Sequence, residues 1–255
     1  METRSRLKKM AQNIQEKEAS KVEKFQEIVL FFFALLSLTH VLLELVESDF
    51  CLYSKALLMP VLMIYAVNDG IDMLFLPALV FAWIGDIFLY WDAEENCFRI
   101  GLGSFLIMQL FYTISFIRLP DASNSYFTLH PTSKTIVIGL YATLYIVLNY
   151  IIADTVIKGN MQVPVLVYSL AICSMSISAL NSSTKNKHSG YSLFIGTLLF
   201  IISDGIIALT KFEIIKLEKF IAQMLIMSTY CLAQAIIVHA YTQMRKSVTA
   251  PNKVK

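Results

Sequence analysis

Long apolar runs alternate with short polar breaks along almost the whole chain. Eight of these runs are each close to the ~20 residues that an α-helix needs to cross the hydrocarbon core of a bilayer. The breaks between them are short or rich in turn-forming residues. The pattern therefore predicts an all-α fold, a polytopic membrane helical bundle with eight transmembrane helices. The predicted spans are 25–46, 51–69, 72–91, 98–119, 134–152, 161–181, 189–210 and 217–243.

The composition supports a membrane protein. Of 255 residues, 56% are hydrophobic and 16% are charged, whereas about a quarter are charged in an average soluble domain. The net charge of +2 and the lack of a basic stripe beyond the N-terminal segment argue against a nucleic-acid partner. Three parts are predicted: a polar cytosolic segment at 1–24, either an amphipathic helix or a disordered tail, a transmembrane domain at 25–243, and a basic cytosolic tail at 244–255.

The distribution of lysine and arginine predicts the direction of the spans. If the N-terminus is cytosolic, the cytosolic side carries 15 basic residues and the opposite side carries 5. Cytosolic loops of membrane proteins carry an excess of basic residues, so both termini are predicted to be cytosolic. No small-residue cleavage site follows the first apolar run, which argues for an anchor and against a secretory signal peptide. These features favour the endoplasmic reticulum membrane.

The two halves of the chain share short sequence patterns in the same order. "MPVLMIY" resembles "VPVLVY", "LVFAWIGD" resembles "LLFIISD", and "LIMQLFY" resembles "LIMSTY". The three pairs fall in predicted spans two, three and four against six, seven and eight. They suggest a four-plus-four internal repeat, and repeated membrane proteins commonly place a site where the repeats meet.

Two aspartates interrupt spans that otherwise read as hydrocarbon. Asp86 lies in "LVFAWIGDIFLYW" and Asp204 lies in "GTLLFIISDGIIALTKF". A carboxylate at the centre of a membrane helix costs about 2.5–3.5 kcal/mol on insertion scales. Each could be a packing residue that bonds to a nearby tyrosine or serine. Two aspartates at matched depth in matched spans favour a shared cavity, nearer the non-cytosolic face.

Further polar residues in the predicted spans are candidates to support these carboxylates. Tyrosines can donate hydrogen bonds to them, amides need partners in lipid, and a lysine at a span end can either snorkel to the surface or meet an anion. The candidates are Lys55, Gln109, Tyr112, Tyr168, Ser203, Tyr230 and Gln234.

No metal or cofactor is predicted. His40 and Glu44 share a helix face at i, i+4 spacing, but no third ligand cluster accompanies them. The chain contains no HExxH, GxSxG, P-loop or CxxC pattern. Cys51 and Cys97 fall on the same predicted side of the membrane, and whether they form a disulfide is left open.

Several of these segments together resemble the lysoplasmalogenase family, the YhhN-like membrane proteins. The resemblance rests on the Gly-Asp span, the Ser-Asp span, the Tyr-x-x-Ala-Gln span in "MLIMSTYCLAQAII" and the Lys-containing "SKALLMPVL", and it covers roughly residues 50–240. Two positions differ from the family pattern: Ala56 stands where a proline usually follows the lysine, and Gln109 stands where many members have histidine. Asp86 and Asp204 match the family's aspartates.

The resemblance implies hydrolysis of the vinyl ether bond of lysoplasmalogens, which gives a fatty aldehyde and glycerophosphoethanolamine or glycerophosphocholine. Such a reaction needs a protonated acid, an anion that stabilises an oxocarbenium ion, and a base for water. Two carboxyl groups can supply all three, as in glycoside hydrolysis. The expected partners are a lysophospholipid within the bilayer and membrane lipids. A transporter with an intramembrane aspartate pair and a catalytically inactive lipid-binding relative are the alternatives, and the oligomeric state is left open.

Overall fold

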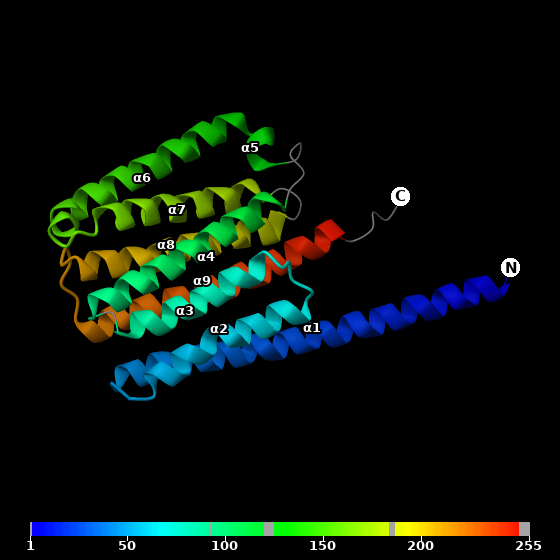
Figure 1. The fold of residues 1–255 in the computed structure, drawn as a ribbon. Coiled ribbons are helices and arrows are strands. Elements are labelled where there is room, and N and C mark those ends of the chain that lie inside the picture. Colours follow the sequence, from blue (N-terminus) through cyan, green and yellow to red (C-terminus); the bar gives the residue numbers. More distant parts are fainter. Residues whose placement is uncertain (1, 92, 120–124, 184–186, 250–255) are drawn as a thin grey trace.

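A computed structural model describes residues 2–91, 93–119, 125–183 and 187–249, and all secondary structure in these residues is helical. The helices form an elongated bundle in which most of them run roughly parallel or antiparallel (Figure 1). The elements are α1 (Glu2–Leu45), α2 (Cys51–Asn68), α3 (Phe75–Phe88), the 3₁₀ helix η1 (Leu89–Trp91), α4 (Glu95–Ile117), α5 (Tyr126–Leu129), α6 (Pro131–Lys158), α7 (Gln162–Asn181), α8 (Lys187–Lys211) and α9 (Lys219–Thr249).

Seven of the described helices are long and apolar enough to cross a membrane, which makes the chain an integral multi-pass membrane protein. The predicted third span at 72–91 is the exception. It contains α3, whose 14 residues rise only ~21 Å at ~1.5 Å per residue, against a hydrocarbon core of ~30 Å. The helix starts late because Asp72 forms a turn before it, with its Oδ1 accepting from the Leu74 N–H at 3.1 Å. Eight spans and the four-plus-four repeat remain predictions.

The first helix is longer than the sequence pattern indicates. Residues 2–45 form one continuous helix, of which Ser20–Leu45 is the apolar part that could cross a membrane. The polar segment predicted at 1–24 therefore continues, in its described residues, into the helix of the first span. Figure 1 shows its N-terminal half projecting beyond the bundle.

The central packing joins consecutive helices and, through α4 with α7 and α1 with α9, helices that are far apart in sequence. The most extensive contacts pair α8 with α9, α3 with α4, α1 with α2, and α4 with α7. Among the described elements, α6 makes its main contacts with α7 and the short α5, and in Figure 1 it lies at the edge of the bundle. The core where α3, α4, α7, α8 and α9 meet is the region into which both predicted aspartates project.

Glu2 at the start of α1 and Thr249 at the end of α9 lie towards the same end of the bundle (Figure 1). At that end, two ion pairs tie α9 to the turn between α2 and α3. Arg245 Nη1 lies 2.5 Å from Asp72 Oδ2, and Lys246 Nζ lies 2.6 Å from Asp69 Oδ1. The opposite end of the bundle holds the turns after α1, α3, α6 and α8.

Candidate functional site

Asp86 lies near the C-terminal end of α3 and is 2% exposed. Its Oδ2 accepts a hydrogen bond of 2.8 Å from the Tyr230 hydroxyl, which α9 supplies from 144 residues away. Phe105 of α4 packs against the residue before it, because Gly85 has no side chain to keep that ring away. The carboxyl group is thus held by one hydroxyl inside a tightly packed junction of three helices.

Asp204 lies in α8, seven residues before the end of that helix at Lys211. The Tyr168 hydroxyl of α7 donates to its Oδ2. Asp204 and Tyr168 line an apolar cavity of about 110 Å³ between α4, α6, α7 and α8. Phe105 packs against Gly85, next to Asp86, and also lines the cavity that contains Asp204, so the structure brings both predicted carboxyl groups into one region at the same end of the bundle.

Lys55 is the fifth residue of α2, is 8% exposed, and acts electrostatically on Asp86. A proline explains how α3 is fixed beside it. Pro60 has no N–H, so the carbonyl of Ala56 four residues earlier loses its helical partner. Trp83 Nε1 of α3 donates to that carbonyl at 2.7 Å. Trp83 was not predicted as a site residue; the signal for it was the proline four residues after Ala56, which leaves a buried acceptor that needs a donor.

A second, polar cavity of about 360 Å³ adjoins the apolar one at this end of the bundle. Leu89, Phe98 and Ile207 line both cavities. The charged side chains that line the polar cavity are Lys55, Lys211, Glu213 and Lys219. Lys55 aside, these charges were not predicted as site residues, because they lie in the turn between α8 and α9 or at the helix ends beside it, and this segment reads in sequence as an ordinary polar connection.

The profile of the YhhN family matches residues 50–241, more than two thirds of the chain. The chain belongs to the YhhN family. This confirms the resemblance found in the sequence, and the family includes lysoplasmalogenases. No curated protein and no solved structure matches the chain. Both aspartates, both tyrosines and both cavities fall within the YhhN region, whereas α1 lies before it.

Three supporting residues predicted in the YhhN region have other partners than the carboxyl groups. The Tyr112 hydroxyl donates its hydrogen bond to Gln234 Oε1 at 2.7 Å, and neither residue bonds to an aspartate. Ser203 donates to the backbone carbonyl of Ile226 at 3.1 Å and links α8 to α9. These contacts give Tyr112, Gln234 and Ser203 a role in packing the helices that carry the site.

Gln109 is fully buried, and neither of its amide atoms makes a hydrogen bond of normal geometry within the described residues, although its side chain lies close to the Tyr168 hydroxyl. It lies one turn along α4 from Phe105, which lines the apolar cavity. Since buried amides are normally paired, Gln109 is a group with unused hydrogen-bonding capacity next to the inner end of that cavity.

The remaining candidates do not form a metal or disulfide site. His40 Nδ1 bonds to Ser54 Oγ at 2.8 Å, and its Nε2 lies 3.9 Å from Glu44 Oε1. No cluster of three or more metal-ligating side chains occurs in the part of the chain that the structure describes. The thiols of Cys51 and Cys97 are both free, which answers the question of their pairing.

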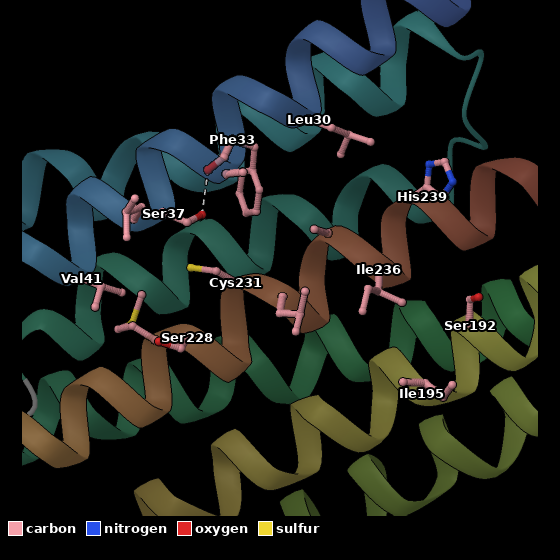
Figure 2. A pocket seen from close by; sticks show the side chains of 15 residues that line it. Leu30, Phe33, Ser37, Val41, Ser192, Ile195, Ser228, Cys231, Ile236 and His239 are labelled. Atoms are coloured by element: carbon pink, nitrogen blue, oxygen red, sulfur yellow. Dashed lines mark hydrogen bonds between the residues drawn. The ribbon is translucent and has the colours of Figure 1, made fainter.

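A larger cavity of the YhhN protein lies elsewhere. It is a groove of about 750 Å³ between α1, α8 and α9, lined mostly by apolar side chains such as Leu30, Val41 and Ile236 (Figure 2). His239 lies at one end of it, and its Nδ1 bonds to the Tyr65 hydroxyl at 2.7 Å. Neither aspartate lines this groove, so its size does not make it the candidate reaction site.

Gly85 and Gly205 flank the two aspartates and give a matched test of the packing. A Cβ at Gly85 would come within 2.7 Å of the Phe105 ring, whereas a Cβ at Gly205 would meet nothing within 4 Å. We expect Gly85→Ala to destabilise the protein by about 1–3 kcal/mol through overpacking. Gly205→Ala should leave the thermal midpoint unchanged or raise it, because alanine favours the helix. Equal midpoints for both variants would contradict the close packing of α3 against α4.

Proposed function

We propose that this YhhN protein is a lysoplasmalogenase, which hydrolyses the vinyl ether bond of lysoplasmenylethanolamine or lysoplasmenylcholine. The observation that carries the proposal is the pair Asp86 and Asp204, each hydrogen-bonded by a tyrosine. Asp204 lines the apolar cavity, which adjoins the lysine-lined cavity. Buried carboxyl groups inside a membrane are costly and are usually functional. The family to which the chain belongs includes enzymes with this activity.

The two adjoining cavities suit the two ends of a lysolipid. The headgroup would occupy the polar cavity, where Lys55 and Lys219 can meet the phosphate as point charges. The vinyl ether would lie beside Asp204 in the apolar cavity, with the hydrocarbon chain continuing towards α6. Since α6 packs mainly on α7 and α5, it is the helix that we expect to move when a chain enters from the bilayer.

The reaction needs only proton transfers and water. A protonated carboxyl group gives its proton to the β-carbon of the vinyl ether, and an oxocarbenium ion forms at the α-carbon. A carboxylate stabilises this cation and takes a proton from the water that attacks it. The hemiacetal then gives its hydroxyl proton to the carboxyl group that protonated the β-carbon, while the other carboxyl group gives the proton it took from water to the ether oxygen. The C–O bond breaks, the ether oxygen leaves as the glycerol hydroxyl, and a fatty aldehyde is released. One water is consumed, and the protons lost and gained by the two carboxyl groups balance.

The surroundings of the two aspartates suggest different roles for them. Lys55 is a buried cation next to Ala56, whose carbonyl accepts from Trp83 of the helix that carries Asp86, and a nearby cation can stabilise an anion. Apolar side chains such as Phe105 and Ile172 line the cavity that contains Asp204, and an apolar site favours a neutral carboxyl group. We therefore assign Asp204 as the proton donor and Asp86 as the anion, with Gln109 available to bond a hydroxyl of the substrate.

The test is aldehyde release by the purified protein in lipid nanodiscs. We expect fatty aldehyde from lysoplasmenylethanolamine or lysoplasmenylcholine and none from the alkyl ether analogues, which cannot be protonated at carbon. A protein that binds these lipids without releasing aldehyde would be an inactive lipid-binding relative. Movement of the intact lipid across sealed vesicles without cleavage would instead support a transporter.

We propose further that α3 with η1 completes an eighth span, with both termini in the cytosol of an endoplasmic reticulum membrane. Glu94 and Asn160 lie in turns at the opposite end of the bundle from Thr249. In a cysteine-free background, Glu94→Cys and Asn160→Cys should react with an impermeant maleimide only from the luminal side of sealed microsomes. Labelling of either cysteine from the cytosolic side would overturn this orientation.

A further inference from the structure

Glu213 is an acid at a position where local structure disfavours one. It follows the C-terminal end of α8 and has a positive φ of 59°. Its N–H bonds to the Thr210 carbonyl at 3.1 Å, and the Ile214 N–H bonds to the Leu209 carbonyl at 2.9 Å. This is the helix-ending motif in which glycine is the usual residue, because it alone adopts positive φ without a steric penalty.

The charge of Glu213 is as unfavourable as its backbone. The C-terminal end of a helix carries a partial negative charge, so a carboxylate there is repelled and a lysine or arginine is preferred. Within the described residues, Glu213 has no ion pair that would offset this repulsion. A residue that goes against local backbone and charge preferences without a structural gain is expected at a functional position. The presence of glutamate at position 213 is therefore to be explained by function.

The polar cavity supplies that explanation. Glu213 lines it together with three lysines, Lys55, Lys211 and Lys219, and with the polar side chains Thr210 and Gln223. Lys55 lies at the protected side of the cavity, whereas Glu213 and Lys219 are exposed at its mouth. A site of several cations with one anion at its rim complements a zwitterion, in which a phosphate enters first and an ammonium group stays nearer to water. Its volume of about 360 Å³ falls within the ~300–1,000 Å³ of small-molecule sites.

We propose that this cavity is a headgroup subsite for phosphoethanolamine or phosphocholine, and that Glu213 is the residue that recognises the amine. The proposal deepens the lysoplasmalogenase function and rests on it for the identity of the lipid. The lysines bind the phosphate, and Glu213 favours lipids whose headgroup ends in a cation over lipids whose headgroup is only anionic. Glu213 is thus a specificity-determining residue that takes no part in the proton transfers.

The experiment measures binding of lipids that the protein cannot cleave. Alkyl ether lysophosphocholine and alkyl ether lysophosphatidate, equal in chain length, are titrated into the full-length protein in nanodiscs. We expect Glu213→Gln to weaken binding of the phosphocholine lipid by about 2- to 5-fold, as for a solvent-exposed ion pair, and to tighten binding of the anionic lipid. Opposite changes for the two lipids are an effect that general damage to the fold does not produce.

Two further variants separate recognition from structure. Glu213→Gly suits the positive φ, so it should raise the thermal midpoint and still lose the preference for the amine. Glu218→Gln removes an acid of the same turn that does not line the cavity, and it should change neither binding constant. The proposal is wrong if wild-type protein binds both lipids equally, or if Glu213→Gln and Glu213→Gly keep the wild-type preference. Absence of aldehyde release would reject the enzyme but would leave this binding result unaffected.

Discussion

Asp86→Asn and Asp204→Asn should each lower the kcat for aldehyde release by about 10²–10⁴-fold, the usual effect of removing a positioned acid or base. Asparagine nearly matches the size of aspartate and can still accept from Tyr230 or Tyr168. Folding and lipid binding should therefore survive, and the loss should appear in kcat. Because both carboxyl groups serve one reaction, the double variant should be little worse than either single variant.

The controls separate a chemical role from a packing role. Asp154→Asn changes an exposed aspartate on α6 that lines neither cavity, and it should keep normal turnover. Tyr230→Phe and Tyr168→Phe each remove one hydrogen bond from a carboxyl group and should cost less than loss of the aspartate. Turnover is compared only among variants whose thermal midpoint and solubility match those of the wild-type protein. If Asp86→Asn or Asp204→Asn keeps more than about a tenth of normal turnover, that aspartate is a packing residue.

Lys55→Met should produce the second largest loss, about 10- to 100-fold in kcat/KM. Hydrogen bonds to charged groups contribute about 1.5–3 kcal/mol, and each 1.36 kcal/mol is a factor of ten. Lys55 is the buried cation that both acts on Asp86 and lines the polar cavity. Its loss should therefore raise KM through the phosphate and lower kcat through Asp86.

The comparison variant for Lys55 is Lys216→Met. Lys216 is an exposed lysine at the same end of the bundle that does not line the polar cavity, so its removal should leave kcat/KM within about twofold if only screened surface charge is lost. Lys55→Arg keeps the charge and should retain more activity than Lys55→Met. Equal activities of Lys55→Met and wild-type protein would show that this lysine only snorkels to the membrane surface.

Much of the architecture was readable from the apolar pattern. Seven spans, the position of both aspartates within them and the family all follow from residue types in order along the chain, because a bilayer forces each spanning segment to satisfy its own backbone as a helix. The same rule does not specify the residues at which a helix starts and stops. It therefore began the third span at residue 72, before the turn after which α3 starts, and left open whether the polar N-terminal segment is helical.

The partners within the site were decided by tertiary structure alone. Tyr112 and Tyr230 stand in similar local sequences, yet only Tyr230 reaches Asp86, while Tyr112 bonds to Gln234. Which tyrosine faces which carboxyl group depends on how α4 and α9 are rotated and packed, and local sequence does not specify that rotation. The apolar pattern thus determined that two carboxyl groups lie within membrane helices. Packing between distant helices decided that they share one region and that the lysines and Glu213 of a surface turn lie beside it.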